Sequence, residues 1–373
     1  MNYDVIVIGT GGVGSAALWQ LAKRGLRVLG LEQFPQAHAN GSSHGQSRII
    51  RQAYFEHANY VPLLRLAYDL WDEVQLDSGR KLFHPVGLLE VGPSDGVLIP
   101  GIRQSVEQHG IPVQWLTDSE ARAEFPMMIP DGMVCAFEPT AGYLLVEQCV
   151  QTHLDLAIRD GASWQQDRVV DWTSDANGVE VITEQARYLA DRLVICGGAW
   201  SATLLADLNI QLQVLPKHQY WFAPKADSKS AASMPTYFYE LDNRYFYGFP
   251  AIDDRGLKVA QHSGGTPTAN PVSLQNLTDE QDERLVYDFA TRYCPLNSCK
   301  LLSQQACMYT MSPDEHFIVD VHPLYERVCF AAGMSGHGFK FTPALGQALA
   351  DLATNQIVQP NIDFLGLKRF STA

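Results

Sequence analysis

Three glycines near the start of the chain have the spacing of a phosphate-binding turn. Gly9, Gly11 and Gly14 follow a run of β-branched residues in the order G-x-G-x-x-G. The first permits a tight turn, the second lets a pyrophosphate approach bare backbone, and the third lets the next helix pack close to the strand. Glu32 follows at the place where a carboxylate can bind ribose hydroxyls and disfavour a 2′-phosphate. Together these residues predict an adenine dinucleotide site; a purely structural turn is the alternative.

Two later pairs of basic residues could act on a bound substrate. Lys258 and His262 lie four apart in a predicted strand, so both side chains are on one face and could face the same pocket. A lysine on an inward strand face is unfavourable unless it has a role. Arg48 and Arg51 lie three apart, and on a helical turn they would share one face. For these arginines a solvated loop is the alternative.

A second glycine-rich segment lies near the C-terminus. It reads Gly333-Met-Ser-Gly-His-Gly-Phe-Lys340, follows a predicted strand over 327–332, and precedes a helix that Pro343 begins. Backbone N–H groups at such a place favour negative charge, including the charge of a reduced flavin ring.

The elements that must position these residues follow from local patterns. We expect strands over 5–8 and 26–31 and a helix over 12–24 around the first glycine group. Another apolar strand, over 192–196, ends in a Gly-Gly pair that begins at Gly197 and predicts a second close approach of backbone to the cofactor. A nicotinamide enzyme seldom needs a second segment of backbone close to its cofactor, whereas a two-lobed FAD protein does.

The stretch 236–250 predicts an aromatic hairpin. It holds seven aromatic residues about an Asp-Asn turn. Rings on the inner face could cradle a methylated amine through cation–π contacts, with ordinary sheet packing as the alternative for any single ring. We therefore expect a two-lobed α/β fold with a Rossmann-like dinucleotide-binding domain and a mixed or antiparallel-sheet substrate domain. The first would contain residues 1–79, 140–213 and 308–373, and the second residues 80–139 and 214–307.

Composition excludes several classes of protein. A chain of 373 residues is long enough for two lobes, and a net charge of −14 without a basic block argues against nucleic acid and anionic membrane surfaces. No apolar run approaches the length of a membrane span. The seven cysteines include no C-x-x-C, and the eleven histidines include no H-x-x-x-H, so we expect no disulfide framework and no metal site. These features favour a cytoplasmic protein with a small-molecule partner.

Taken in order, the motifs resemble the monomeric sarcosine oxidase family, which includes N-methyltryptophan oxidase, among the FAD-dependent amine oxidases. The resemblance extends over essentially the whole chain. The segments that carry it, beyond the first glycine group, are Gly45-Gln-Ser-Arg-Ile-Ile-Arg51, Tyr247-Gly-Phe-Pro250, Lys258 with His262, Cys307-Met-Tyr-Thr310, Asp314-Glu-His316 and Ser335-Gly-His-Gly-Phe-Lys340.

The resemblance implies roles for individual residues. Cys307 would carry a thioether bond to the flavin, Arg51 and Lys340 would bind the substrate carboxylate, and Lys258 would be the cation beside which oxygen is reduced. His262, Tyr247 and Tyr309 would surround the substrate, and His44 and Arg48 would lie against the flavin ring. The positions expected to contact FAD are Gly9, Gly11, Gly14, Glu32, Ser42, Ser47, Arg48, Val169, Gly197, Cys307, Gly336, Gly338 and Lys340.

The chain departs from the family at a few positions. Gln46 and Ser47 stand where the family has Asp-Thr, and Phe238 occupies a position in the wall around the substrate. These differences bear on the size of the substrate more than on the reaction.

The expected activity is therefore the oxidation of an N-methyl amino acid to formaldehyde and the primary amino acid, with oxygen reduced to hydrogen peroxide by a monomeric enzyme. N-methyltryptophan or another secondary amino acid is the alternative to sarcosine. A flavin dehydrogenase with a different electron acceptor is a second possibility, against which Lys258 argues. A non-catalytic FAD-binding protein is a third, and it would need no paired cations such as Arg51 and Lys340 around the ring.

Overall fold

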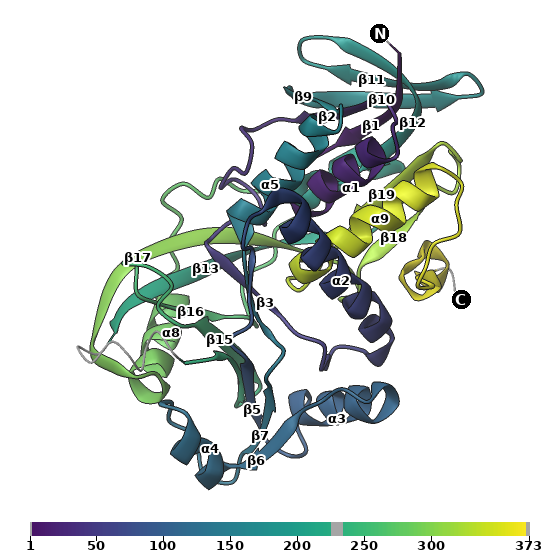
Figure 1. The fold of residues 1–373 in the computed structure, drawn as a ribbon. Helices are drawn as coiled ribbons and strands as arrows, with labels where there is room; N and C mark the ends of the chain where they lie inside the picture. Colours follow the sequence, from purple (N-terminus) through teal and green to yellow (C-terminus); the bar gives the residue numbers. More distant parts are fainter. Residues whose placement is uncertain (1, 225–233, 371–373) are drawn as a thin grey trace.

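The structure is a computed structural model that describes residues 2–224 and 234–370. Within these residues the chain forms two large sheets and one small sheet, with most of the long helices gathered around the first (Figure 1). The side chain of Cys299 lies outside the described part, and Cys135, Cys149, Cys196, Cys307 and Cys329 are free thiols.

The first sheet is built on the β-branched N-terminal segment. Strand β1 is parallel to β2 on one side and to β12 on the other, and β12 is parallel to β19. β10 and β11 extend the sheet as an antiparallel pair. The strands of this sheet are β1 (Asn2–Ile8), β2 (Val28–Glu32), β9 (Ser163–Gln166), β10 (Val169–Asp175), β11 (Gly178–Thr183), β12 (Arg187–Ile195), β18 (Ile318–Val321) and β19 (Val328–Ala332).

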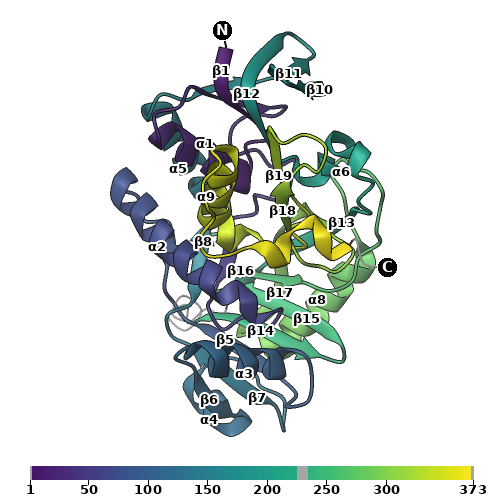
Figure 2. The same ribbon diagram turned by 90° about the vertical axis from the view of Figure 1, so that its right-hand side faces the viewer.

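Four helices pack beside this sheet, and α1 is in contact with both α5 and α9 (Figure 2). A Cβ on Gly346 of α9 would lie 2.7 Å from the backbone of Ala16 in α1, so the small residue allows a close helix crossing. Leu18, Trp19 and Leu21 of α1 are fully buried, and each contributes about 1.5–3 kcal/mol of burial free energy. The helices are α1 (Gly12–Lys23), α2 (Val61–Ser78), α5 (Val146–Arg159) and α9 (Thr342–Ala353).

The second sheet is mixed and carries the predicted aromatic hairpin. β14 and β15 pair antiparallel across Asp242 and Asn243, both in the left-handed backbone region that a tight hairpin turn requires. β5 pairs in parallel with β14 and antiparallel with β7. In spatial order the strands are β17 (Leu296–Met311), β13 (Gln213–Pro224), β16 (Leu257–Gln261), β15 (Arg244–Phe249), β14 (Thr236–Leu241), β5 (Leu88–Gly92), β7 (Val134–Glu138) and β6 (Gln114–Thr117).

Shorter elements complete the fold. A small sheet of β3, β8 and β4 leads from the first sheet toward the second, since β8 precedes α5 and β4 precedes β5. Its strands are β3 (Ser47–Ile50), β8 (Gly142–Leu145) and β4 (Phe83–His84). The remaining helices are α3 (Leu98–His109), α4 (Asp118–Glu124), α6 (Ser201–Leu204) and α8 (Glu280–Tyr293).

One local expectation is wrong. Arg48 lies within strand β3 and Arg51 directly follows it, so the two arginines do not share a helical turn. The segment pairs antiparallel with β8, where Arg48 is opposite Leu144. Ile49 and Ile50 are β-branched and buried, and such residues favour a paired strand over a helical turn.

No helix among residues 2–224 and 234–370 has the length and apolar character to cross a membrane. Over the same ranges, no group of three or more His, Cys, Asp or Glu side chains is placed to hold a metal ion.

Candidate active site

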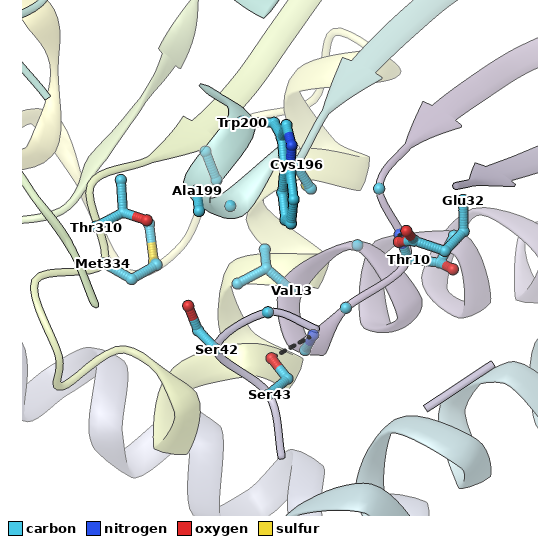
Figure 3. A pocket seen from close by; sticks show the side chains of 18 of the residues that line it. Thr10, Val13, Glu32, Ser42, Ser43, Cys196, Ala199, Trp200, Thr310 and Met334 are labelled. Carbon is cyan, nitrogen blue, oxygen red and sulfur yellow. Dashed lines mark hydrogen bonds between the residues drawn. The ribbon is translucent and has the colours of Figure 1, made fainter. Parts of the chain in front are cut away.

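A cavity of about 210 Å³ opens where the first glycine group meets the C-terminal glycine-rich segment. Glu32 and Thr10 lie at one end of it, and Thr310 and Met334 lie at the other (Figure 3). Its walls come from the start of α1, the segments after β2 and β12, and the ends of β17 and β19. The cavity therefore extends from the first glycine group and Glu32 to the C-terminal glycine-rich segment.

The glycine turn is held closed by contacts that only glycine permits. Gly9 has a φ of 81°, and a Cβ on Gly14 would lie 1.8 Å from the carbonyl oxygen of Gly9. At Gly11 the nearest atom to an added Cβ is 3.6 Å away, so its open side faces the cavity. The Gly12 N–H donates to Ser43 Oγ over 3.0 Å, which closes the far wall of the turn (Figure 3).

Glu32 is oriented at the end of β2. Its Oε2 accepts a hydrogen bond of 3.0 Å from the Thr10 N–H, and the side chain is 8% exposed where it reaches the cavity. A carboxylate fixed in this way has free lone pairs for two ribose hydroxyls and would repel a 2′-phosphate.

Buried polar atoms in the wall test whether FAD fits. Thr310 Oγ1, Thr342 Oγ1 and Asp167 Oδ1 line the cavity and have no hydrogen-bond partner within the described residues. Because unpaired buried polar groups are unfavourable, we expect a ligand with hydrogen-bond donors and acceptors along its length to bind here. The wall thus suits FAD.

The structure divides the thirteen predicted cofactor residues into three groups. Ten of them line the cavity: Gly9, Gly11, Gly14, Glu32, Ser42, Arg48, Val169, Gly197, Gly336 and Gly338. Ser47 and Cys307 are fully buried and do not line it, although Met308, Tyr309 and Thr310, directly after Cys307 in β17, do. Lys340 lines a smaller adjoining cavity instead.

That smaller cavity, of about 50 Å³, shares Arg48, Tyr309, Gly336 and Phe339 with the larger one. It brings together residues that are far apart in the sequence. Its other lining residues are Ile49, Arg51, Glu56, Phe238, Tyr247, His262, His337 and Lys340. Five of the predicted substrate residues therefore surround one space beside the cofactor cavity.

Arg51 is buried but already paired. Its Nη2 donates to Glu56 at 2.7 and 2.9 Å, and its Nε lies 3.4 Å from Glu90 Oε1. Burial opposes the charge of Glu56, but Arg51, His337 and Lys340 together lower the pKa of Glu56 to about 2. A carboxylate that enters the cavity must therefore compete with Glu56 for the guanidinium.

Lys340 supplies the second cation of this cavity. Its Nζ donates to the His337 carbonyl oxygen over 2.8 Å and lies 5.2 Å from the Tyr54 ring centre. Burial, and then the charge of Arg51, lower the pKa of Lys340 to about 7. Its charge is therefore sensitive to an anion that binds nearby.

The aromatic wall carries a neutral histidine. His262 Nδ1 and Tyr309 Oη are 3.2 Å apart in a hydrogen bond, and burial, assisted by Lys217, lowers the pKa of His262 to about 3. Burial raises the pKa of Tyr247 to about 12. Since these groups are uncharged at neutral pH, they surround the cavity with polar but neutral atoms.

Lys258 and His262 do not face the same cavity. His262 lines the smaller one, whereas Lys258 lies behind the 45–47 turn, where its Nζ donates to the carbonyl oxygens of Gly45 and Ser47 at 2.5 and 2.9 Å. Lys258 is completely buried, and burial together with Arg48 lowers its pKa well below the usual value. The ammonium group is held by the two carbonyls because it has no water to solvate it.

Arg48 and His44 flank that turn. Arg48 donates to the carbonyl oxygens of Ser47 and Ser42, each over 2.9 Å, and it lines both cavities. His44 is buried behind the wall, its Nδ1 3.0 Å from Gln305 Nε2, and it lines neither cavity.

Cys307 has an unexpected partner. Gln219 Nε2 donates to Cys307 Sγ over 3.3 Å, and the cysteine is fully buried in β17 opposite Lys217 of β13. Cys307 is thus followed directly in β17 by Met308, Tyr309 and Thr310, which line the larger cavity.

Sequence reasoning missed Glu56, Glu90 and Phe55. Phe55 packs at a tilt against Phe238, with 5.5 Å between ring centres, and the Arg51 guanidinium lies 4.9 Å from the ring centre of Phe55. Glu90 could have been noticed, because it is a lone acid within the apolar strand Leu88 to Val91. Glu56 gave no signal, since an acid in a polar loop is ordinary.

Comparisons with known proteins agree with this architecture. Residues 4–352 match the sequence profile of the family described as FAD dependent oxidoreductase. The chain is 38% identical to monomeric sarcosine oxidase of Streptomyces avermitilis, over 100% of this chain and 99% of that protein. It is 36% identical to N-methyl-L-tryptophan oxidase of Yersinia pestis, over 99% of this chain and 100% of that protein.

Solved structures agree on the fold. NikD, an unusual amino acid oxidase essential for nikkomycin biosynthesis, superimposes with a TM-score of 0.86 at 24% identity, over 98% of this chain and 97% of that one. Glycine oxidase from Geobacillus kaustophilus gives a TM-score of 0.82 at 20% identity, over 99% of both chains. The expected two-lobed fold is confirmed. The chain therefore belongs to the FAD dependent oxidoreductase family, in the group that holds monomeric sarcosine oxidase and N-methyl-L-tryptophan oxidase.

Proposed function

We propose that the protein is an FAD-dependent oxidase of a small N-methyl amino acid such as sarcosine. With one O2 and one water, the N-methyl amino acid gives the primary amino acid, formaldehyde and hydrogen peroxide. The names of the full-length relatives support the substrate class.

The observation that carries this proposal is the convergence of Arg51 and Lys340 on one cavity beside the dinucleotide cavity. A planar guanidinium and an ammonium together hold a carboxylate firmly. Bound FAD would supply the redox chemistry, since it can take a hydride equivalent from a methyl carbon and transfer electrons to oxygen. A carboxylate held between Arg51 and Lys340 would direct the amine toward Tyr309 and Gly336, the residues that both cavities share.

The other residues around the cavity have complementary tasks. Neutral His262, hydrogen-bonded to Tyr309, places no positive charge near the amine and so favours its unprotonated, reactive form. Rings of Tyr247 and Phe238 line the space for an N-methyl group. Arg48, which lines both cavities, would lie against the flavin ring. Lys258 and His44 would act from the layer behind it, with Lys258 as the cation that favours reduction of oxygen.

The size of the smaller cavity favours sarcosine over N-methyltryptophan. A volume of about 50 Å³ holds roughly three to five water-sized groups, which is the scale of a glycine derivative and not of an indole. Phe238 lines this space and packs against Phe55 behind it.

The test is oxygen consumption by the purified flavoprotein with sarcosine and with N-methyltryptophan. We expect turnover of sarcosine with stoichiometric formaldehyde and peroxide. No turnover of any N-methyl amino acid contradicts the substrate class. Bleaching of the flavin by sarcosine without air, but no oxygen consumption, favours a dehydrogenase. No bleaching at all favours a non-catalytic FAD-binding protein.

We further propose that FAD is attached covalently through Cys307, whose neighbours in β17 line the cofactor cavity. Acid precipitation checks this, because a covalent flavin leaves the pellet yellow. Cys307→Ser should give a colourless pellet and a yellow supernatant, and Cys329→Ser, a change at another buried cysteine, is the matched control. A yellow pellet from Cys307→Ser contradicts the attachment site.

The remaining proposals concern the whole molecule. We propose a cytoplasmic monomer, in which residues 1–79, 140–213 and 308–373 form the FAD-binding domain and residues 80–139 and 214–307 form the substrate domain. The names of the sarcosine oxidases support the monomer. Light scattering of the purified protein gives its mass, and a dimer mass contradicts the proposal.

A further inference from the structure

Glu90 is a buried acid, and its Oε1 has no hydrogen-bond partner within the described residues. It lies in the middle of β5 with 1% of its surface exposed. In the sheet it is opposite Phe238 of β14 and Ala136 of β7, and residues opposite one another share a face. Phe238 lines the smaller cavity, so Glu90 is on the side of the sheet that faces the site.

The nearest charge to Glu90 is Arg51. Glu90 Oε1 lies 3.4 Å from Arg51 Nε, yet neither atom has a hydrogen-bond partner within the described residues. Arg51 instead directs Nη2 to Glu56. Glu90 is therefore the second carboxyl beside a guanidinium that already has a partner.

The other acids that face Glu90 each accept hydrogen bonds from N–H groups. Glu138, on β7, accepts hydrogen bonds from the backbone N–H groups of Gln52 and Ala53. Glu56 pairs with Arg51, and Lys340 of the glycine-rich segment is a further charge that acts on Glu90. Among Glu56, Glu90 and Glu138, Glu90 binds a proton at the lowest cost in free energy. Within the described residues it alone accepts no hydrogen bond from an N–H group.

We propose that Glu90 is a specificity-determining residue, a proton-binding carboxyl behind Arg51 that sets how much positive charge Arg51 offers to the carboxylate of the substrate. When Glu90 is neutral, Arg51 can exchange Glu56 for an incoming carboxylate. When Glu90 is ionised, it cancels the charge of Arg51 and weakens that exchange. The inference rests on the proposed function, in which Arg51 receives the substrate carboxylate.

The direction of titration follows from the surroundings. Burial, which outweighs the opposing charge of Arg51, raises the pKa of Glu90 to about 8, with Glu138 and Glu56 acting in the same direction. An anion bound to Arg51 disfavours ionised Glu90 and so binds together with its proton. Affinity for a carboxylate should fall as pH rises through about 8.

The test measures binding without turnover, so it remains valid if the proposed substrate is wrong. The FAD-loaded protein and its Glu90→Gln variant are titrated with sodium acetate at pH 7 and pH 9, and the change in flavin absorption gives Kd. We expect similar Kd values at pH 7. At pH 9 the variant should bind acetate up to about tenfold more tightly than the native chain, because about nine-tenths of Glu90 is ionised one pH unit above its pKa.

Three controls isolate the effect. The same comparison in a Lys340→Met background removes the titration of that lysine. Acetamide, a neutral probe of the same shape, should show no difference between the proteins. Glu240→Gln changes another buried acid, on β14, whose oxygens accept N–H groups at the start of α3, and it should leave the acetate profile unchanged.

A purely structural role for Glu90 predicts the opposite sign, with weaker binding at every pH. That result, an unchanged pH profile in Glu90→Gln, or no acetate binding by the native chain would each overturn the proposal. If Glu90→Gln does not fold, Glu90→Leu suits the apolar surroundings and gives the same readout. Acetate binding with the expected profile but no oxidation of N-methyl amino acids would refute the proposed function alone.

Discussion

The two adjoining cavities are built by different means. The larger one is lined by glycines and backbone from short contiguous segments, and its requirements are steric, as at Gly9 and Gly14. The smaller one is lined by charged and aromatic side chains from β3, the 51–56 loop, the aromatic hairpin and the segment before α9. A cofactor that stays bound can be held by the shape of its cavity. A substrate that binds and leaves is held by buried charges, which interact strongly because little water screens them. Burial of these charges also destabilises the fold.

The largest expected effect concerns the steric requirement of the larger cavity. Gly14→Ala would place a Cβ 1.8 Å from the Gly9 carbonyl oxygen. We expect a loss of about 3 kcal/mol or more, enough to yield protein without flavin. The ratio of flavin to protein absorbance measures it. Gly41→Ala, also in the wall but with its nearest neighbour 3.4 Å away, should keep its flavin. Full flavin in Gly14→Ala would show that shape does not decide cofactor binding.

Removal of the guanidinium tests the charged cavity. Arg51→Gln should lower kcat/KM for sarcosine by about 10²-fold, because a charge-assisted pair is worth about 1.5–3 kcal/mol, while flavin content stays normal. Steady-state kinetics measures the loss. Arg187→Gln, which breaks an exposed pair with Glu180, should have no effect. An Arg51→Gln enzyme with native kcat/KM would remove the carboxylate site from this cavity.

Replacement of Lys340 should affect substrate binding and the free energy of unfolding in opposite directions. The Lys340 pKa of about 7 lies below that of a free lysine, so the unfolded chain binds more protons between pH 7 and 10 and the buried lysine destabilises the fold. Lys340→Met should raise the free energy of unfolding by about 2 kcal/mol at pH 7 and raise the KM for sarcosine about tenfold.

In the native chain, substrate affinity should fall as pH rises through about 7, because Lys340 loses its proton. Lys340→Met should abolish this fall. Thermal melts and the dependence of KM on pH report the two effects. Lower stability in Lys340→Met would mean that its hydrogen bond to His337 outweighs the cost of burying its charge.

The smallest effect concerns the aromatic wall. Phe238→Ala should shift the ratio of kcat/KM for N-methyltryptophan over sarcosine by about five- to tenfold, since extra space in an apolar pocket is worth about 1–3 kcal/mol. Phe246→Ala opens a gap on the opposite face of the same hairpin and should leave the ratio unchanged. Equal shifts in both variants would indicate a general loss of packing.

The resemblance of the motifs gave the family, and the comparisons confirm it. Local patterns also predicted α1, β2, the aromatic hairpin and the helix begun by Pro343, because each depends on residues close in sequence. The pattern failed at Arg48 and Arg51, where pairing with the distant strand β8 overrode a helical spacing.

By itself, the sequence determined the nucleotide-binding turn and its acid, since glycine spacing and strand ends are local properties. Only the tertiary structure decided the charges of the substrate cavity. It paired Arg51 with Glu56, placed Glu90 behind it and enclosed Lys258 under the 45–47 turn. The reason is physical: the charge of a buried group depends on which distant side chains and carbonyls replace its water, and that depends on how the sheets come together.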